Sequence, residues 1–327
     1  MKFNLTHRPR RIRKNSLIRS LFEESCLKLD HLVYPVFISD CTNVPEKIES
    51  MPEIFRWPAN KIVSKIHEWK DLGLNSFALF PHIDQSKKCQ LGKEALNPES
   101  LIYKICKEIK SSISDIVLIG DLALDPYTTH GHDGILGSKG QIDNDSTVDV
   151  LSRMSILAAE AGYDFVAPSD MMDGRIYAIR SRLDDHNFTE TGIISYSAKF
   201  SSAYYGPFRE AIGSSQCKPI DKSSYQLNPR NFREAKRELE LDFEEGADIL
   251  MVKPAEPYLD IINYASNNFN LPISAYQVSG EYSRLWASHL NGWLDLDSCA
   301  LESLYSIKRA GADIIFTYFA ERIASKI

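Results

Sequence analysis

The sequence predicts an α/β protein folded as one (β/α)8 barrel, also called a TIM barrel, with an N-terminal arm. Eight short apolar segments alternate along the chain with segments of helical character. One type of helix-to-strand junction occurs three times. No glycine-rich phosphate loop follows an early strand, as an open doubly wound sheet would require. With 327 residues and 43% hydrophobic side chains, the chain can bury the core of a single barrel domain.

The apolar segments have the length and composition of buried parallel strands. Such strands are covered on both faces, so they appear as continuous apolar runs and not as alternating ones. The predicted strands are 31–38, 75–81, 115–124, 163–169, 192–199, 247–254, 272–280 and 312–319. Eight strands with helices between them favour a closed barrel.

The repeated junction reads Ala161-Gly-Tyr-Asp164, Glu245-Gly-Ala-Asp248 and Ala310-Gly-Ala-Asp313. In each copy a glycine closes a helix and an acidic residue opens the next strand. Repetition of this junction indicates repeated β/α units.

Residues 1–30 precede the predicted barrel, which takes up residues 31–327. Seven Arg and Lys residues stand before Leu21, with few apolar residues to build a core. We expect this arm to pack on a neighbouring subunit of a homo-oligomer. An organellar transit peptide and a nucleic-acid-binding arm are alternative interpretations of the same basic segment.

Composition excludes several classes of protein. A net charge of −6 argues against a general nucleic-acid or membrane-surface role. No apolar run approaches the roughly 20 residues of a membrane span, and no secretory signal is recognisable, so we expect a cytoplasmic protein. The cysteines show no metal-ligand spacing, which argues against structural zinc and a disulfide framework; they are Cys26, Cys41, Cys89, Cys106, Cys217 and Cys299.

Two lysines end predicted strands, Lys199 in Ser195-Tyr-Ser-Ala-Lys199 and Lys253 in Ile249-Leu-Met-Val-Lys253-Pro254. Burial beside apolar groups and a second cation lowers the pKa of an ammonium, so part of it is neutral amine near pH 7. A neutral amine can attack a ketone to form a Schiff base. The alternative is a strand-capping lysine paired with an acid.

Aromatic and cationic residues follow Lys199. Tyr205, Phe208 and Arg209 could wall a pocket that desolvates an amine while the guanidinium binds a carboxylate. Lys222 and Gln226, in a Ser-rich stretch, could belong to a covering loop. An aromatic cluster of this kind is also typical of ordinary core packing.

An acidic loop follows the third predicted strand. Asp121, Asp125 and Asp133 have the spacing of ligands for a hard cation, although loops rich in Gly, Pro and Asp are common without any metal. His130 and His132 in the same loop raise the alternative of a zinc hydrolase.

The zinc-hydrolase alternative would need further ligands on later strands. The remaining histidine candidates, His186 and His289, fall in predicted helices or loops. A non-catalytic barrel that serves as a binding protein is a further alternative. The presence of both lysines together with carboxylate-binding candidates disfavours it.

Taken together, six motifs in order resemble the porphobilinogen synthase (5-aminolevulinate dehydratase) family over nearly the whole chain. They are Ala167-Pro-Ser-Asp-Met-Met-Asp-Gly174, Tyr196-Ser-Ala-Lys199, Tyr204-Tyr-Gly-Pro-Phe-Arg209, Met251-Val-Lys-Pro with Pro257-Tyr-Leu-Asp260, Tyr276-Gln-Val-Ser-Gly-Glu-Tyr282 and Phe316-Thr-Tyr-Phe319. The resemblance implies a lyase of heme biosynthesis in which two molecules of 5-aminolevulinate condense through lysine Schiff bases. Two waters are lost and porphobilinogen forms.

The resemblance also implies residue roles. Lys253 would form the imine of the molecule that supplies the propionate side, and Lys199 that of the acetate side. Two groups of residues would hold the two substrate carboxylates, and two aromatic residues would wall the pocket. The first carboxylate would bind Ser279 and Tyr318, the second would bind Arg209, Lys222 and Gln226, and the walls would be Tyr205 and Phe208.

The resemblance finally bears on metals and assembly. Zinc-using family members have three cysteines where this chain has Ala123, Asp125 and Asp133, so we expect no active-site zinc and, instead, the aspartate-rich variant associated with magnesium. By the resemblance, Glu238 occupies the place of an acidic residue linked to allosteric Mg²⁺; the alternative is that it belongs to the solvated face of an amphipathic helix. Family members form octamers through the arm, which implies the same for residues 1–30.

Overall fold

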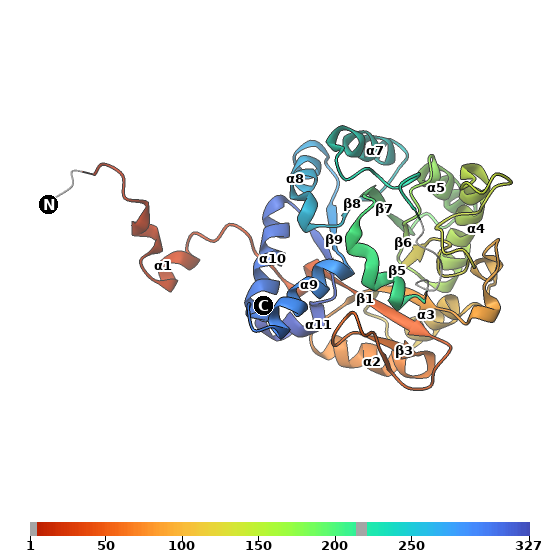
Figure 1. Ribbon diagram of the computed structural model, residues 1–327, viewed down its shortest axis with the longest axis horizontal. Coiled ribbons are helices and arrows are strands. Elements are labelled where there is room, and N and C mark those ends of the chain that lie inside the picture. The colour runs from red at the N-terminus through yellow and green to blue at the C-terminus, as the bar shows by residue number, and fades with distance from the viewer. Residues whose placement is uncertain (1–4, 214–220) are drawn as a thin grey trace.

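A computed structural model of the chain describes residues 5–213 and 221–327 (Figure 1). Parallel strands form a sheet that closes on itself, because its last strand also pairs with its first. The barrel strands are β1 (Leu32–Ser39), β4 (Ser76–His82), β5 (Val117–Leu122), β6 (Phe165–Pro168), β7 (Gly192–Lys199), β8 (Ile249–Lys253), β9 (Ile273–Gln277) and β10 (Ile314–Thr317). This closed barrel confirms the predicted (β/α)8 fold.

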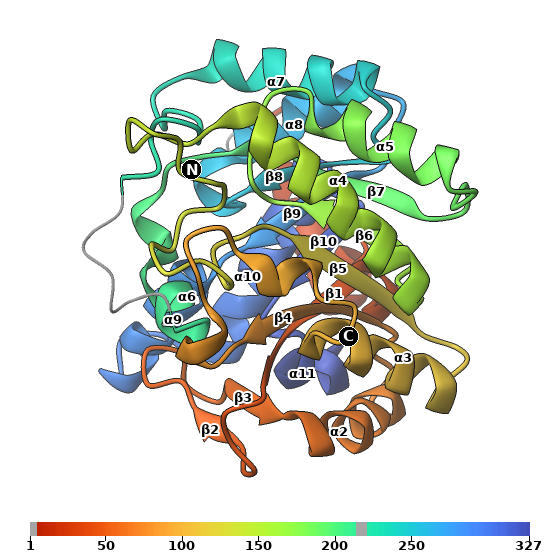
Figure 2. The ribbon, with the colours of Figure 1, turned by 90° about the vertical axis from the view of Figure 1, so that its right-hand side faces the viewer.

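Helices surround the barrel on the outside (Figures 1 and 2). The longer ones are amphipathic and bury their apolar face against the strands. The longer helices are α2 (Ala59–Asp71), α3 (Leu101–Ser112), α4 (Asn144–Ala161), α5 (Arg175–Asp185), α7 (Phe232–Glu244), α8 (Leu259–Asn268), α9 (Ser279–Leu290) and α10 (Leu296–Ala310). Two short helices are α6 (Gly206–Ala211) and α11 (Ala320–Ile323).

In each of the three repeated junctions, the aspartate is tied to the sheet by a hydrogen bond. Its carboxylate accepts a backbone N–H from the first or second residue of the barrel strand that precedes the junction. The bonds are Leu118 to Asp164 at 2.7 Å, Ile193 to Asp248 at 2.7 Å and Ile273 to Asp313 at 2.9 Å. Gly162 and Gly311, the helix C-caps, have φ of 99° and 117°, a conformation that favours glycine.

All eight predicted strands are present, and their boundaries agree to within two residues except for one, which is wrong by three. The strand predicted over 272–280 ends at Gln277, and Ser279 is the first residue of α9. The buried carboxylate of Glu281 accepts the Val278 N–H at 2.6 Å, which starts the helix here. Ser279 therefore lies at a helix N-terminus and not at a strand end.

Two short strands, β2 (Glu46–Lys47) and β3 (Phe55–Pro58), have no counterpart among the predicted strands. β3 runs parallel to β1, with Arg56 opposite Phe37, and β2 pairs antiparallel with β3. Both are too short to show a strand periodicity in the sequence. They belong to an insertion, residues 40–58, between β1 and α2.

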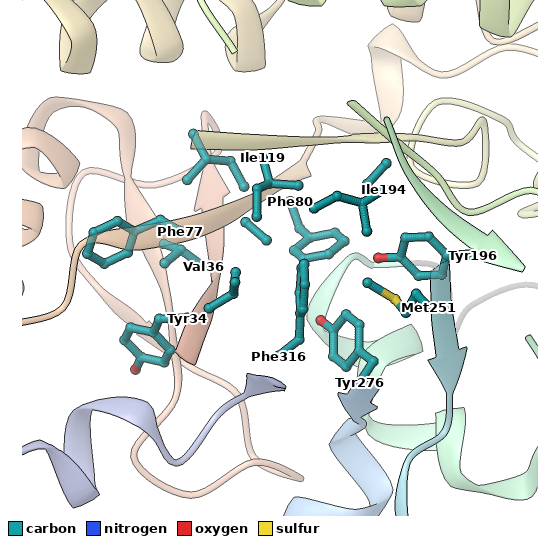
Figure 3. Close-up of a cluster of buried hydrophobic side chains, with 14 of the residues drawn as sticks. Tyr34, Val36, Phe77, Phe80, Ile119, Ile194, Tyr196, Met251, Tyr276 and Phe316 are labelled. Atoms are coloured by element: carbon teal, nitrogen blue, oxygen red, sulfur yellow. The ribbon is translucent and has the colours of Figure 1, made fainter. Parts of the chain in front are cut away.

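Apolar side chains fill the interior of the barrel. Figure 3 shows Val36, Ile119, Ile194 and Phe316 pointing toward one another from different strands, and each is at most 2% exposed. The Phe316 ring stacks on Tyr276 with centroids 5.2 Å apart. The barrel is thus a packed core, and only the ends of its strands are available for chemistry.

The described part of the arm projects away from the barrel (Figure 1). Its helical turns, η1 (Pro9–Arg13) and α1 (Ser16–Ser20), contain no buried residue. Leu17 is 80% exposed and Leu21 is 78% exposed.

Residues 1–4 of the predicted arm lie outside the described residues, and so does Cys217. The other cysteines are free thiols. No helix in the described ranges is long and apolar enough to cross a bilayer.

Candidate active site

The carboxyl ends of the barrel strands open into one cavity that encloses about 450 Å³ including its mouth. Most of the predicted site residues meet in its wall, although they come from six segments of the chain. The wall consists of Phe80, Asp121, Asp125, Ser169, Lys199, Tyr205, Phe208, Arg209, Lys222, Gln226 and Lys253.

Lys253 is the last residue of β8 and is 6% exposed. Aromatic rings surround its ammonium: Nζ lies 4.1 Å from the ring centroid of Tyr276, 4.9 Å from Tyr196 and 5.4 Å from Phe208. Burial, followed by the positive charge of Lys199, lowers the pKa of Lys253 to about 7. A large fraction of this side chain is therefore a neutral amine at physiological pH.

Lys199 ends the neighbouring strand β7 and is also 6% exposed. Its Nζ donates a hydrogen bond to the Ser169 carbonyl oxygen and lies 3.7 Å from the carboxylate of Asp133. The ring centroid of Tyr196 is 5.9 Å away, so this tyrosine faces both lysines. The two amines share one pocket.

The carboxylates of the acidic loop contact ammonium groups. Lys222 Nζ lies 2.8 Å from Asp133 and 3.4 Å from Asp125. Burial raises the pKa of Asp133, but the charges of Lys199 and Lys222 outweigh it and lower the value to about 2. Burial raises the pKa of Asp125, against the charge of Lys222. Asp133 is thus a fixed negative charge between two lysines.

Asp121, on β5, lies in the cavity wall without an ion pair among the described residues. Its buried Oδ1 has no hydrogen-bond partner there. Burial and then the charge of Asp125 raise its pKa to about 7. A carboxyl group with this pKa, near two lysines, can exchange a proton at neutral pH.

Ser279 and Tyr318 do not line this cavity, but each contacts a residue beside Lys253. The Ser279 hydroxyl accepts the Phe208 N–H at 3.0 Å and donates to the Tyr204 carbonyl at 3.4 Å. A side chain at Gly280 would come within 2.4 Å of the same carbonyl, so the close approach of α9 requires glycine. The Tyr318 hydroxyl lies 3.1 Å from that of Tyr276, whose ring covers Lys253.

Glu238, on α7, lies outside the active-site cavity. It lines a separate cavity of about 1050 Å³, including its mouth, with Asp173, Tyr225 and Gln226, of which Gln226 also lines the active site. Burial raises the pKa of Glu238 to about 7; Arg175 lowers it, and neighbouring carboxylates such as that of Asp173 raise it. Mg²⁺ binds proteins through one or two carboxylates and keeps several waters, so this acidic surrounding fits the ion.

The described residues contain no group of three His, Cys, Asp or Glu side chains placed to hold a metal ion. His130 Nε2 lies 3.1 Å from the Gln90 carbonyl, and His132 Nδ1 lies 3.1 Å from the Tyr225 hydroxyl. The zinc-hydrolase alternative therefore lacks its ligand set in these ranges of the chain.

Phe80 and Arg175 are two residues of the site and its surroundings that the sequence did not indicate. Phe80, near the carboxyl end of β4, lies in the cavity wall, but its apolar side chain indicated only core packing. Arg175 is 1% exposed and binds both carboxylate oxygens of Asp242, at 3.1 and 2.9 Å. It also donates to the Tyr196 carbonyl at 3.2 Å. An arginine in a helical segment gives no sequence signal of such burial.

Comparison with known proteins agrees with this geometry. The family model "Delta-aminolevulinic acid dehydratase" matches residues 6–326. The chain is 46% identical over 324 residues to the delta-aminolevulinic acid dehydratase of Bradyrhizobium diazoefficiens, covering 99% of this chain and 92% of the relative. It is 47% identical over 316 residues to the Chlamydia pneumoniae protein of that name, covering 97% and 95%.

A solved structure is similar over the same extent. The delta-aminolevulinic acid dehydratase (porphobilinogen synthase) of Toxoplasma gondii, in complex with the reaction product porphobilinogen, superposes with a TM-score of 0.96 at 42% identity. The match covers 99% of this chain and 92% of that one. On the family match, the sequence identity and the shared fold, this chain belongs to the delta-aminolevulinic acid dehydratase family.

Proposed function

We propose that this chain is a porphobilinogen synthase, a lyase that condenses two molecules of 5-aminolevulinate into porphobilinogen with the loss of two waters. One observation carries the proposal: two buried lysines end adjacent strands in a single cavity. Its membership of the family and its likeness to the product-bound Toxoplasma enzyme support the same activity.

Each lysine would form an imine with the ketone of one substrate molecule. Lys253 suits this role because its amine is partly neutral near pH 7 and can attack the carbonyl carbon, with the carbonyl oxygen leaving as water. Lys199 would bind the second molecule next to the first. Holding both substrates in one pocket replaces a difficult encounter of two free molecules, and each protonated imine acidifies the adjacent carbon.

Asp121 suits the proton transfers that such a condensation requires. It lies in the same cavity wall as both lysines, and its pKa of about 7 allows it to accept and return a proton at neutral pH. Asp133, held ionised, suits the binding of a positive charge, such as a substrate ammonium.

The substrate carboxylates would bind at two places. Arg209, Lys222 and Gln226 lie in the cavity wall and would bind the carboxylate of the molecule on Lys199. Burial lowers the pKa of Lys222, but the charges of Asp133 and Asp125 raise it by more than burial lowers it. The net pKa is raised, so Lys222 stays positively charged. Ser279 and Tyr318 would bind the other carboxylate through their hydroxyl groups.

We further propose that Glu238 holds an allosteric Mg²⁺ through its carboxylate and bound waters. Its acidic surroundings and the cavity that it shares with Gln226 support this assignment. We propose no active-site zinc, because Asp125 and Asp133 are hard oxygen ligands engaged by Lys222. Octamer assembly through residues 1–30 and a cytoplasmic location stay predictions.

The experiment is porphobilinogen formation from 5-aminolevulinate by metal-stripped enzyme, with magnesium and then zinc added back. Activity that magnesium restores and zinc does not affect is the expected result. Borohydride reduction followed by mass spectrometry provides the second readout, since it converts an imine to a stable secondary amine on lysine. Absence of both product and labelled lysine would refute the proposal.

A further inference from the structure

The insertion between β1 and α2 holds the short helix α6, which carries two residues of the active-site wall. We propose that Arg56, in this insertion, is a positioning residue for substrate binding, and that it acts through α6 together with Glu210. This inference rests on the proposed function, because Arg209, one of the two wall residues on α6, is assigned to the substrate on Lys199.

Arg56 lies on β3 and is 7% exposed. Its Nε donates to the Ala211 carbonyl at 2.7 Å, and its second terminal nitrogen donates to the Glu210 carbonyl. The remaining terminal nitrogen lies 2.9 Å from the carboxylate of Glu46 on β2. The guanidinium thus satisfies carbonyl groups at the C-terminal end of α6, where a helix lacks internal donors.

Glu210 makes the reciprocal contact. Its carboxylate accepts the backbone N–H groups of Glu49 and Ser50 at 3.1 and 3.3 Å. The insertion is itself tied to α9, since the Ser283 hydroxyl donates to the Ser50 carbonyl at 2.6 Å. Side chains therefore cross in both directions between α6 and a segment some 150 residues earlier in the chain.

The other end of α6 is fixed to the active site. The Phe208 N–H donates to the Ser279 hydroxyl at 3.0 Å, and α6 packs beside α9 (Figure 2). The Phe208 ring lies 5.5 Å from that of Phe80 and 5.4 Å from Lys253 Nζ. Fixing both ends of so short a helix holds the side chains between them, Phe208 and Arg209, at one place in the cavity wall.

Loss of the Arg56 contact should therefore weaken substrate binding more than it slows chemistry. Arg209 is assigned to the substrate carboxylate, which does not react, so its displacement removes binding that ground state and transition state share. Removal of such uniform binding raises KM and leaves kcat nearly unchanged. A merely structural role would instead reduce the amount of folded enzyme and lower the apparent kcat.

The test compares Arg56→Gln, Arg56→Lys and Glu210→Ala with Arg322→Gln as the matched control. Arg322 also pairs with the insertion, at 3.0 Å from Glu53, and with Asp297 at 2.6 Å, but within the described part of the chain its ion pairs do not involve α6. Each protein is mixed with 5-aminolevulinate over a range of concentrations and reduced with borohydride. Mass spectrometry of peptides then gives the concentration at which Lys199 and Lys253 are each labelled.

We expect Arg56→Gln to raise the concentration for half-labelling of Lys199, and the KM of turnover, by about tenfold. Labelling of Lys253 and kcat should change by less than about twofold. Arg56→Lys, which retains a donor, should recover part of the loss, and Glu210→Ala should act in the same direction as Arg56→Gln.

Two results would overturn the inference. One is unchanged labelling of Lys199 in a folded Arg56→Gln or Glu210→Ala protein whose melting temperature matches that of the wild type. The other is an equal shift in Arg322→Gln. If the wild-type protein itself shows no labelled lysine, the proposed function fails, and that outcome is distinct from both.

Discussion

Lys199 and Lys253 are directly opposite each other on β7 and β8, and an irregularity in β7 produces this alignment. Ser195 pairs with Leu250, but the register then shifts between Ser195 and Ala198. Continuing the earlier register would place Lys199 opposite Pro254. One extra residue in a strand re-aims the side chains beyond it, and irregularities of this kind are frequent next to active sites. Here the shift brings two amines together in one cavity.

The substitution Lys253→Met should abolish porphobilinogen formation, with a decrease of at least about 10³-fold in kcat. Methionine fits the aromatic surroundings of Lys253 and lacks the amine that forms the imine. Turnover and borohydride labelling are the measurements, and circular dichroism checks the fold. Retention of more than a few per cent of activity by the variant would remove Lys253 from its role.

Imine formation at Lys253 should depend on pH because only the neutral amine reacts. With a pKa of about 7, its rate should rise from about pH 6 to pH 8 and then level off. Lys199→Met removes a positive neighbour that lowers this pKa, so the profile should move to higher pH. Asp121→Asn removes a negative neighbour that raises it, so the profile should move to lower pH.

The measurement for this pH dependence is the initial rate of borohydride-trapped labelling at Lys253. Lys104→Met is a suitable control, since Lys104 is an exposed residue on α3 that pairs with Glu99. Shifts in the same direction for Lys199→Met and Asp121→Asn would contradict the electrostatic origin of the low pKa.

The strands and the two lysines could be predicted because their signals are local. Each buried strand is a continuous apolar run, and a lysine that ends such a run stands out in the sequence. The register of β7 on β8 could not be predicted, because a bulge depends on contacts between strands. The contact of Arg56 with α6 could not be predicted either, since the partners of Arg56 lie far along the chain and are backbone carbonyls. Nothing in the identity of a residue indicates which carbonyl it will meet.

Removal of one partner from the buried ion pair of Arg175 and Asp242 should strongly destabilise the protein. Both residues are at most 1% exposed, and removal of one partner leaves an uncompensated charge in the core. Arg175→Met should therefore destabilise the protein by about 3–5 kcal/mol. Arg153→Met, at an exposed pair with Asp149 3.7 Å away, should cost at most about 1 kcal/mol. The measurement is the free energy of unfolding in urea. A similar decrease in this free energy for both variants would show that removing the buried arginine costs no more than removing an exposed one.

Glu238→Ala should abolish stimulation by magnesium and leave the basal rate within about twofold, because Glu238 lies outside the active-site cavity. Mg²⁺ binds the ionised carboxylate, and this group has a pKa of about 7. Protons therefore compete with the ion below that pH, and the wild-type enzyme should need more magnesium for half-stimulation at pH 6 than at pH 8.

Glu240→Ala, at an exposed position of the same helix, is the matched control and should keep both the stimulation and its pH dependence. Magnesium titrations of porphobilinogen formation at the two pH values test both expectations. Unaltered stimulation in Glu238→Ala would place the allosteric ion elsewhere, whereas equal loss in both variants would indicate an effect of the overall charge of α7.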